Sequence, residues 1–175
     1  LVERDSKVQS LAQGYRDWCA EHPEFTVQVM AEAIQLGTEL VVAAGHWRPA
    51  AGAFRTAWEQ KFGNHLEGVF DPALDGLVDE DLLEYVRHMA RHGVEVRHPP
   101  LQARWRTSPH KSAKDFILEA CAKAWKDAHK GRILLCDAEL VKELKGVLAT
   151  PMARVPKMNP DRTLSDEGRF VHDQR

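Results

Sequence analysis

Apolar residues recur at intervals of three and four through most of the first 130 residues, and this spacing constrains the fold more than any other feature of the chain. Such intervals place side chains on one face of an α-helix. In the first expected helix that face carries Val8, Leu11 and Tyr15, and Pro23 is expected to end it. The pattern predicts a region built from helices that each bury one apolar stripe.

Capping residues predict where four further helices begin and end. Each has a suitable first residue and a glycine close to its end, where the left-handed conformation is common. The expected helices run from Thr26 to Gly45, from Pro49 to Gly63, from Asp79 to Gly93 and from Ser108 to Gly131. In the last one, Ser108 is the expected N-cap and Pro109 the first helical residue, so we predict a single uninterrupted helix.

The pattern changes in the last part of the chain. Residues 132–136 form a short apolar run that predicts a β-strand, and Asp137 is expected to cap a brief helix that ends at Leu144. Two runs of alternating apolar residues then flank a loop rich in Pro, Asn, Asp, Ser and Gly, which predicts a β-hairpin. The sequence thus predicts a mainly α fold with a C-terminal β-hairpin (α+β): a helical region over 1–130, then a strand, a short helix and the hairpin over 131–175.

Charge is distributed unevenly, although the net charge of the chain is only −2. Residues 1–86 hold 6 Lys or Arg against 15 Asp or Glu, whereas residues 87–130 hold 10 against 4. A basic segment beside an acidic one is typical of a surface that binds nucleic acid. It is also typical of two segments that attract each other and pack together, and the modest aromatic content of the basic segment favours this second interpretation. Both interpretations stay open at this point.

The cysteines and the hydropathy pattern bear on the cellular compartment. The three cysteines are isolated, with no Cys-x-x-Cys spacing, which is typical of a reducing, intracellular compartment. No apolar run approaches the roughly 20 residues that span a bilayer, so we expect no membrane partner. The charged N-terminus does not have the pattern of a signal peptide. Because Leu1 is not a methionine, we expect the chain to be a fragment, a processed product or a trimmed form of a longer protein.

The last 26 residues resemble a known protein family. They read Thr-Pro-x-x-x-Val-x-Lys at 150–157 and Arg-x-x-x-Asp-x-Arg at 169–175, with Pro-Asp-Arg-Thr-Leu-Ser in the loop between. This pattern resembles the opening fingers segment of reverse transcriptases, the RNA-directed DNA polymerases encoded in retroelement pol polyproteins. Weaker similarity extends through the second half of the chain, and the first 80 residues add nothing to it.

The resemblance implies roles for four cations. In the family, the lysine that ends the first fingers strand and the arginine that opens the second close over the phosphates of the incoming nucleotide, and Lys157 and Arg169 match them. Two cations on paired strands can also grip a polyphosphate on general grounds, because the strands fix their separation. Without the resemblance they are ordinary solvated cations. Arg154 and Arg175 are candidate contacts to the template backbone, or equally ordinary surface arginines.

Two features depart from the commonest family pattern or are missing from the chain. Pro156 stands where a second lysine is frequent, and it removes a ladder donor, so we expect the first strand to be an edge. The family's aspartate at the position of Asp173 is structural, and its metal-binding aspartates, with their Tyr-x-Asp-Asp motif, lie farther downstream. That motif is absent here. We therefore expect no catalytic or metal-binding residue in this chain, no cofactor in it, and Mg²⁺ in the parent polymerase.

A histidine cluster is the other candidate site. His88 and His92 lie four residues apart on an expected helix, with His98 nearby, a spacing that zinc can use. No HExxH motif or neighbouring cysteine accompanies them, so a polar helix face is the favoured interpretation.

The sequence taken together predicts the N-terminal part of a retroelement reverse transcriptase that contributes nucleotide and template grip and is inactive alone. The expected partners are a nucleic-acid template-primer, a deoxynucleotide triphosphate and the rest of the polymerase downstream of Arg175. The alternative is a non-catalytic helical module of a polyprotein that binds protein or nucleic acid, because four or five amphipathic helices fit that equally well.

Overall fold

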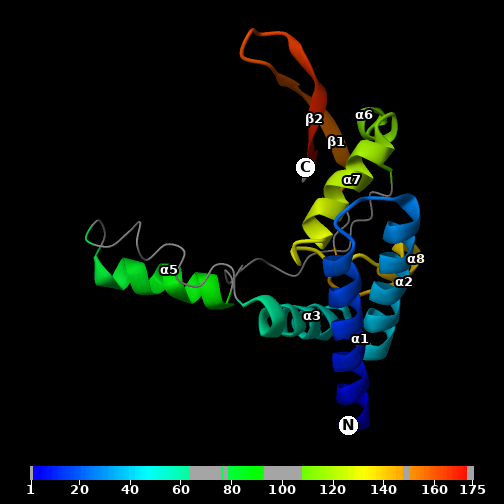
Figure 1. Ribbon diagram of the computed structural model, residues 1–175, viewed down its shortest axis with the longest axis vertical. Helices are drawn as coiled ribbons and strands as arrows, with labels where there is room; N and C mark the ends of the chain where they lie inside the picture. The colour runs from blue at the N-terminus through cyan, green and yellow to red at the C-terminus, as the bar shows by residue number, and fades with distance from the viewer. Residues whose placement is uncertain (1, 64–75, 77–78, 93–107, 148–149, 173–175) are drawn as a thin grey trace.

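Helices dominate the protein, and a two-stranded antiparallel hairpin follows them, so the predicted fold class is confirmed (Figure 1). The computed structural model describes residues 2–63, 76, 79–92, 108–147 and 150–172. The helices are α1 (Val2–Glu21), α2 (Val27–Ala44), α3 (Trp47–Phe62), α5 (Glu80–His92), α6 (Lys111–Lys114), α7 (Ile117–Ala128) and α8 (Ala138–Glu143), and the strands are β1 (Met152–Met158) and β2 (Leu164–His172).

The boundaries of α2 follow its capping residues as predicted. The Thr26 hydroxyl accepts a hydrogen bond from the Val29 amide at 3.0 Å, which satisfies one of the free donors at the helix start. At the other end Gly45 has a φ of 77° and its amide donates to Val41. Arg4 of α1 adds a second cap, because its Nη2 donates to the Ala44 carbonyl at 2.8 Å. The N-terminal part of α1 is thereby tied to the end of α2.

Helix α3 begins earlier than the sequence predicted. His46 is its N-cap, with a ring nitrogen that accepts from the Arg48 amide at 3.2 Å, so Trp47 rather than Pro49 is the first helical residue. Pro49 is then the third residue of the helix, where a missing N–H removes no intrahelical bond. The predicted end is confirmed, since α3 stops at Phe62, just before Gly63.

The core lies between α1, α2, α3 and α7, and Figure 1 shows these helices gathered in one body. Trp125 of α7 is its largest fully buried side chain, and its indole donates to the His22 carbonyl at 2.9 Å. The buried residues of the core are Val8, Ala12, Tyr15, Cys19, Ala33, Leu40, Val41, Ala44, Ala50, Ala53, Phe54, Ala57, Trp125 and Ala128. Among the described residues, α2 alone has the length and apolar composition of a membrane-spanning helix. The core helix of a soluble protein can have the same properties, and α2 contributes residues to this core.

The prediction of a single helix from Ser108 is wrong, because this segment forms two helices, α6 and α7. The break lies at Asp115 and Phe116, where Phe116 leaves the helical conformation with φ −124° and ψ 37°. Both pieces contact the hairpin, but only α7 continues into the core. The His110 amide, just before α6, donates to Met152 of β1, whereas α7 runs into the core through Trp125.

The strand predicted at residues 132–136 is also wrong. The segment has no regular secondary structure, and no strand pairs with it among the described residues. A side chain satisfies its backbone instead: the Tyr15 hydroxyl accepts from the Leu135 amide at 2.8 Å and donates to the Ile133 carbonyl at 3.4 Å. The helix predicted next is confirmed as α8, capped by Asp137, although it ends one residue earlier than expected.

The hairpin stands at one end of the molecule, opposite the N-terminus (Figure 1). Its register pairs Met152 with His172, Val155 with Arg169 and Pro156 with Gly168, and then shifts before Met158 pairs with Leu164. The loop is closed by the Asn159 amide, which donates to the Thr163 carbonyl at 2.8 Å.

Helix α5 lies to one side of the bundle in Figure 1. It begins after Asp79, as predicted, and the carboxylate of this residue accepts from the Leu82 amide at 2.8 Å. Gly93, its predicted end, lies outside the described residues.

Candidate functional site

The two faces of the hairpin differ in chemistry. Residues that pair across an antiparallel ladder share a face, and alternate residues of each strand lie on opposite faces. One face, here called the outer face, carries Ala153, Val155, Lys157, Glu167, Arg169 and Val171. The other, the inner face, carries Arg154, Pro156, Gly168 and Phe170, and the side chains of Arg154 and Phe170 contact residues of α7.

Lys157 and Arg169 lie together on the outer face, and two observations place them there. Arg169 pairs with Val155, which is two residues from Lys157 on the same strand. In addition, Lys157 Nζ lies 3.2 Å from Glu167 Oε2, and Glu167 is two residues from Arg169. The residues that the resemblance singled out are therefore brought to one side of a paired-strand element.

Both cations are accessible from solvent. The Lys157 side chain is 40% exposed and its partner Glu167 is more exposed still, so their ion pair lies at the surface. Arg169 is exposed, and within the described part of the chain its guanidinium has no ion-pair or hydrogen-bond partner. A surface pair of this kind is worth roughly 0–1 kcal/mol, so a phosphate can displace Glu167 at little cost.

Arg154 is on the inner face, and its side chain is only 8% exposed. Its Nε lies 2.7 Å from Glu119 Oε2, and its guanidinium carbon is 3.8 Å from the ring centre of Phe116. A buried, charge-assisted contact and a cation–π contact together hold it inside the protein. This placement argues against the template contact considered for Arg154, because the guanidinium already has internal partners. Arg175 lies outside the described residues.

Glu119 of α7 connects both strands to the helix. Its Oε2 accepts from Arg154 of β1, while its Oε1 accepts from Lys123 at 2.8 Å and from the Gly168 amide of β2 at 3.0 Å. These donors, with Lys123 the strongest influence, lower the pKa of the carboxyl from the usual 4.5 to about 2. The side chain is thus ionised throughout the physiological pH range.

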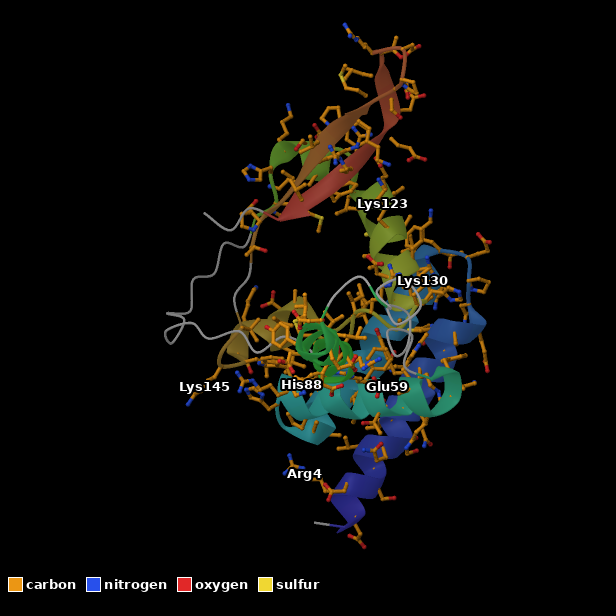
Figure 2. All side chains as sticks on the ribbon, turned by 90° about the vertical axis from the view of Figure 1, so that its left-hand side faces the viewer. Arg4, Glu59, His88, Lys123, Lys130 and Lys145 are labelled. Atoms are coloured by element: carbon orange, nitrogen blue, oxygen red, sulfur yellow. The ribbon has the colours of Figure 1, made fainter. Side chains whose placement is uncertain are left out.

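Lys123 completes the arrangement beneath the hairpin, where Figure 2 labels it on α7. Its Nζ also donates to the Gly168 carbonyl and lies 5.3 Å from the ring centre of Phe170. We call the set formed by Phe116, Glu119, Lys123, Arg154 and Gly168 the inner clasp. It fixes the hairpin on α7 by contacts to both strands.

The sequence pattern did not reveal the inner clasp. Glu119 and Lys123 are four residues apart, a spacing that commonly signifies no more than a surface ion pair on a helix. Gly168 within a strand was the available signal, because a strand glycine often marks the close approach of another group. A Cβ at this position would lie 2.5 Å from Arg154 Nε.

The other sequence candidates gather no comparable chemistry. His88 is exposed on α5, while the His92 side chain, His98 and Asp173 lie outside the described part. No group of three or more His, Cys, Asp or Glu among the described residues could hold a metal ion. Cys19 is fully buried, and burial raises the pKa of its thiol to about 11, which leaves it protonated and inert.

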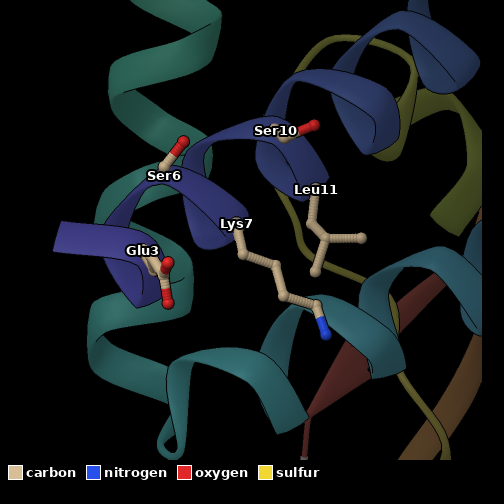
Figure 3. A pocket seen from close by; sticks show the side chains of 5 residues that line it. All are labelled: Glu3, Ser6, Lys7, Ser10 and Leu11. Atoms are coloured by element: carbon tan, nitrogen blue, oxygen red, sulfur yellow. The ribbon is translucent and has the colours of Figure 1, made fainter. Parts of the chain in front are cut away.

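Two surface depressions lie away from the hairpin. One is lined by Glu3, Ser6, Lys7, Ser10 and Leu11, all from α1 (Figure 3). The other lies between α2 and α8 and is lined mainly by apolar atoms near Thr38 and Leu140. The first holds one cation beside one carboxylate, and the second holds two carboxylates, Glu39 and Asp137, without a cation. Neither gathers two cations, so the outer face of the hairpin is the candidate site.

Comparisons with protein-family models, with curated proteins and with solved structures each find no match for this chain.

Proposed function

We propose that this chain is the N-terminal part of a retroelement RNA-directed DNA polymerase, and that the outer face of its hairpin binds the phosphates of an incoming deoxynucleotide triphosphate. Lys157 and Arg169 are the proposed phosphate ligands. The proposal assigns the metal-binding carboxylates, Mg²⁺ and most template contacts to the polymerase downstream of this chain. Arg175 stays a predicted template contact.

The observation that carries the proposal is the placement of two accessible cations on one face of an anchored hairpin. A triphosphate carries several negative charges, and Lys and Arg neutralise them through charge-assisted hydrogen bonds. Strands clasped to a helix hold such groups at a constant separation, which lowers the entropy lost on binding. Lys157 is also at the position where the resembling family has its fingers lysine, and Arg169 where it has its arginine.

The proposal can be tested on the chain itself with inorganic tripolyphosphate and with a deoxynucleotide triphosphate. Calorimetric titration at low salt should show binding, and Lys157→Ala or Arg169→Ala should each weaken it about tenfold or more, the effect of losing one charge-assisted bond. Lys142→Ala is a matched control for Lys157, because Lys142 is 42% exposed and also pairs with a glutamate, but on α8. Arg132→Ala is the control for Arg169→Ala, because Arg132 is also an exposed arginine but lies outside the hairpin, where it pairs with Asp127.

The controls decide between a site and general charge. If all four variants weaken binding equally, Lys157 and Arg169 act only as ordinary surface cations and the hairpin has no specific phosphate site. Primer extension is a separate check: the chain alone should extend no primer in Mg²⁺ or Mn²⁺, and reproducible extension by the pure chain would contradict the proposed division of labour.

A second function is favoured by a different observation. The core belongs to α1, α2, α3 and α7, and no hairpin residue contributes to it. Helix α7 also meets α1 without ion pairs between described residues: the His129 ring nitrogen lies 2.8 Å from the Cys19 carbonyl, and the other contacts are largely apolar. The helical part therefore has its own core and can form a separate module. Its exposed cations, such as Lys126 and Lys130, are available to bind nucleic acid.

Salt dependence separates the two functions. A helical nucleic-acid module should bind single-stranded DNA weakly, lose affinity steeply as salt rises because counterions are released, and be indifferent to changes at Lys157 and Arg169. Fluorescence anisotropy at low and moderate salt measures this. Binding that instead follows the two hairpin cations would favour the polymerase assignment.

A further inference from the structure

Glu119 makes contact with both strands of the hairpin through a single carboxylate. Its Oε2 is 2.7 Å from Arg154 Nε on β1, and its Oε1 is 3.0 Å from the Gly168 amide on β2. A carboxylate that bridges two strands in this way determines the angle of the strand pair on α7 as well as its position. No other described residue of α7 accepts hydrogen bonds from both strands.

The geometry of Gly168 makes the bridge possible. Its N–H and C=O are both turned to α7, where Glu119 accepts from the former and Lys123 donates to the latter. These groups are therefore not used in the ladder, which agrees with the pairing of Gly168 to Pro156, a residue with no N–H. Arg154 passes directly over Gly168 on its way to Glu119, in space that a side chain would fill.

Glu119 contacts the hairpin through the inner-face side chain of Arg154 and through the Gly168 backbone at the edge of β2, and no contact within the described part of the chain joins it to an outer-face side chain. Its influence on that face must pass through the strands. Lys157 and Arg169 occupy the same two strands as Arg154 and Gly168, and a paired ladder moves as a unit.

We propose that Glu119 is a positioning residue for the polyphosphate site: by clasping Arg154 and Gly168 from the inner face, it holds Lys157 and Arg169 in the orientation that grips phosphate. This inference rests on the function proposed above for the outer face. It adds to it a residue, and a second set of contacts, that neither sequence pattern nor resemblance indicated.

Charge and position predict opposite effects for the loss of Glu119, which makes the test sharp. If Glu119 acted only through its charge, its removal would make the region more positive and would strengthen polyphosphate binding. If it acts by position, Glu119→Ala should weaken the binding of inorganic tripolyphosphate about tenfold, as does the loss of one of the two cations. Glu119→Gln keeps one acceptor oxygen, which can serve either Gly168 or Arg154, and should restore part of the affinity.

The same variants allow a readout that does not depend on any ligand. In Glu119→Ala the Gly168 amide loses its acceptor, so its hydrogen exchange, followed by NMR, should speed up about tenfold or more. Gly168→Ala is a second variant that leaves charge unchanged: its Cβ would displace Arg154, and it should weaken tripolyphosphate binding as Glu119→Ala does. Because the core contains no hairpin residue, both variants should keep the helical fold.

Glu59→Gln and Glu59→Ala are the matched controls, since Glu59 also pairs with a cation on its own helix, at 2.8 Å, but lies on α3 away from the hairpin (Figure 2). Both should leave tripolyphosphate affinity and Gly168 exchange unchanged. Unaltered or tighter binding in Glu119→Ala, with the wild type binding normally, would overturn the positioning role alone. A wild-type chain that binds no tripolyphosphate would overturn the proposed function, and the positioning role with it.

Discussion

The hydroxyl of Tyr15 accepts a hydrogen bond from the Leu135 amide at 2.8 Å across 120 residues of sequence. Tyr15 is fully buried in α1, and burial raises the pKa of its phenol well above its usual value. The same hydroxyl donates to the Ile133 carbonyl. One side chain thus supplies backbone partners to a segment that has no neighbouring strand among the described residues.

Tyr15→Phe should destabilise the protein by about 1–3 kcal/mol, because it leaves the Leu135 amide without its partner in a largely buried place. Urea unfolding followed by circular dichroism measures the change. Tyr85→Phe is the control: Tyr85 is 57% exposed on α5, so the free energy of unfolding should stay within about 0.5 kcal/mol of wild type. Equal effects of the two changes would contradict the role given to the Tyr15 hydroxyl.

Gly37→Ala should also destabilise the protein, by about 1–3 kcal/mol. A Cβ on Gly37 would lie well within van der Waals distance of the Leu135 carbonyl, and since the obstacle is backbone, α2 and the 133–136 segment would have to move apart. Gly52→Ala is the matched change in α3, where a Cβ meets nothing within 4 Å. It should stabilise the helix by up to about 1 kcal/mol. Thermal unfolding should therefore shift in opposite directions in the two variants.

Acid should loosen the hairpin through Glu119. The folded protein lowers the pKa of this carboxyl from 4.5 to about 2, so its contribution to stability is fully present above about pH 4.5 and is lost as the pH falls towards 2. The charged groups that face it are Lys123 and Arg154, which remain cationic over this range. The Gly168 amide resonance should titrate with a midpoint near pH 2 in the wild type and should lose this transition in Glu119→Gln.

The proposed function predicts that, in a full-length polymerase, Lys157→Ala or Arg169→Ala lowers kcat/KM for the nucleotide by roughly 10- to 100-fold, because each lost charge-assisted contact is worth about 1.5–3 kcal/mol. The stability of the fold should barely change, since exposed hairpin cations contribute little to it. Steady-state primer extension with varied nucleotide measures the first effect, and thermal unfolding the second. Unaltered nucleotide kinetics in both variants would show that the outer face does not bind the nucleotide.

Capping and turn residues predicted the secondary structure well wherever the conformation depends on residues nearby in the sequence. The start of α2 at Thr26 and its end at Gly45 depend on hydrogen bonds made within four residues, so the sequence carries them in full. The hairpin was predictable for the same reason, since alternation and turn residues are local. The start of α3 was predicted too late because histidine is a less usual N-cap. The His46 ring accepts from the Arg48 amide, so the helix begins two residues before Pro49.

The failures occur where a distant partner decides the local conformation. Residues 132–136 have the composition of a strand, but Tyr15 and the close approach of α2 at Gly37 take the place of a neighbouring strand. The helix predicted from Ser108 breaks at Phe116 because α6 follows β1 while α7 enters the core. Neither partner can be inferred from the segment itself.

The sequence alone determined that the chain is mainly helical, that it ends in a hairpin, and that Lys157 and Arg169 fall on paired strands, because periodicity, caps and turn residues act over a few positions. Tertiary structure alone decided that Arg154 is turned inward and that Glu119 bridges both strands. Burial, and the choice of partner for a charge, depend on which segments meet in space. A carboxylate on one helix can select its donors only after the core around Trp125 has set where that helix lies.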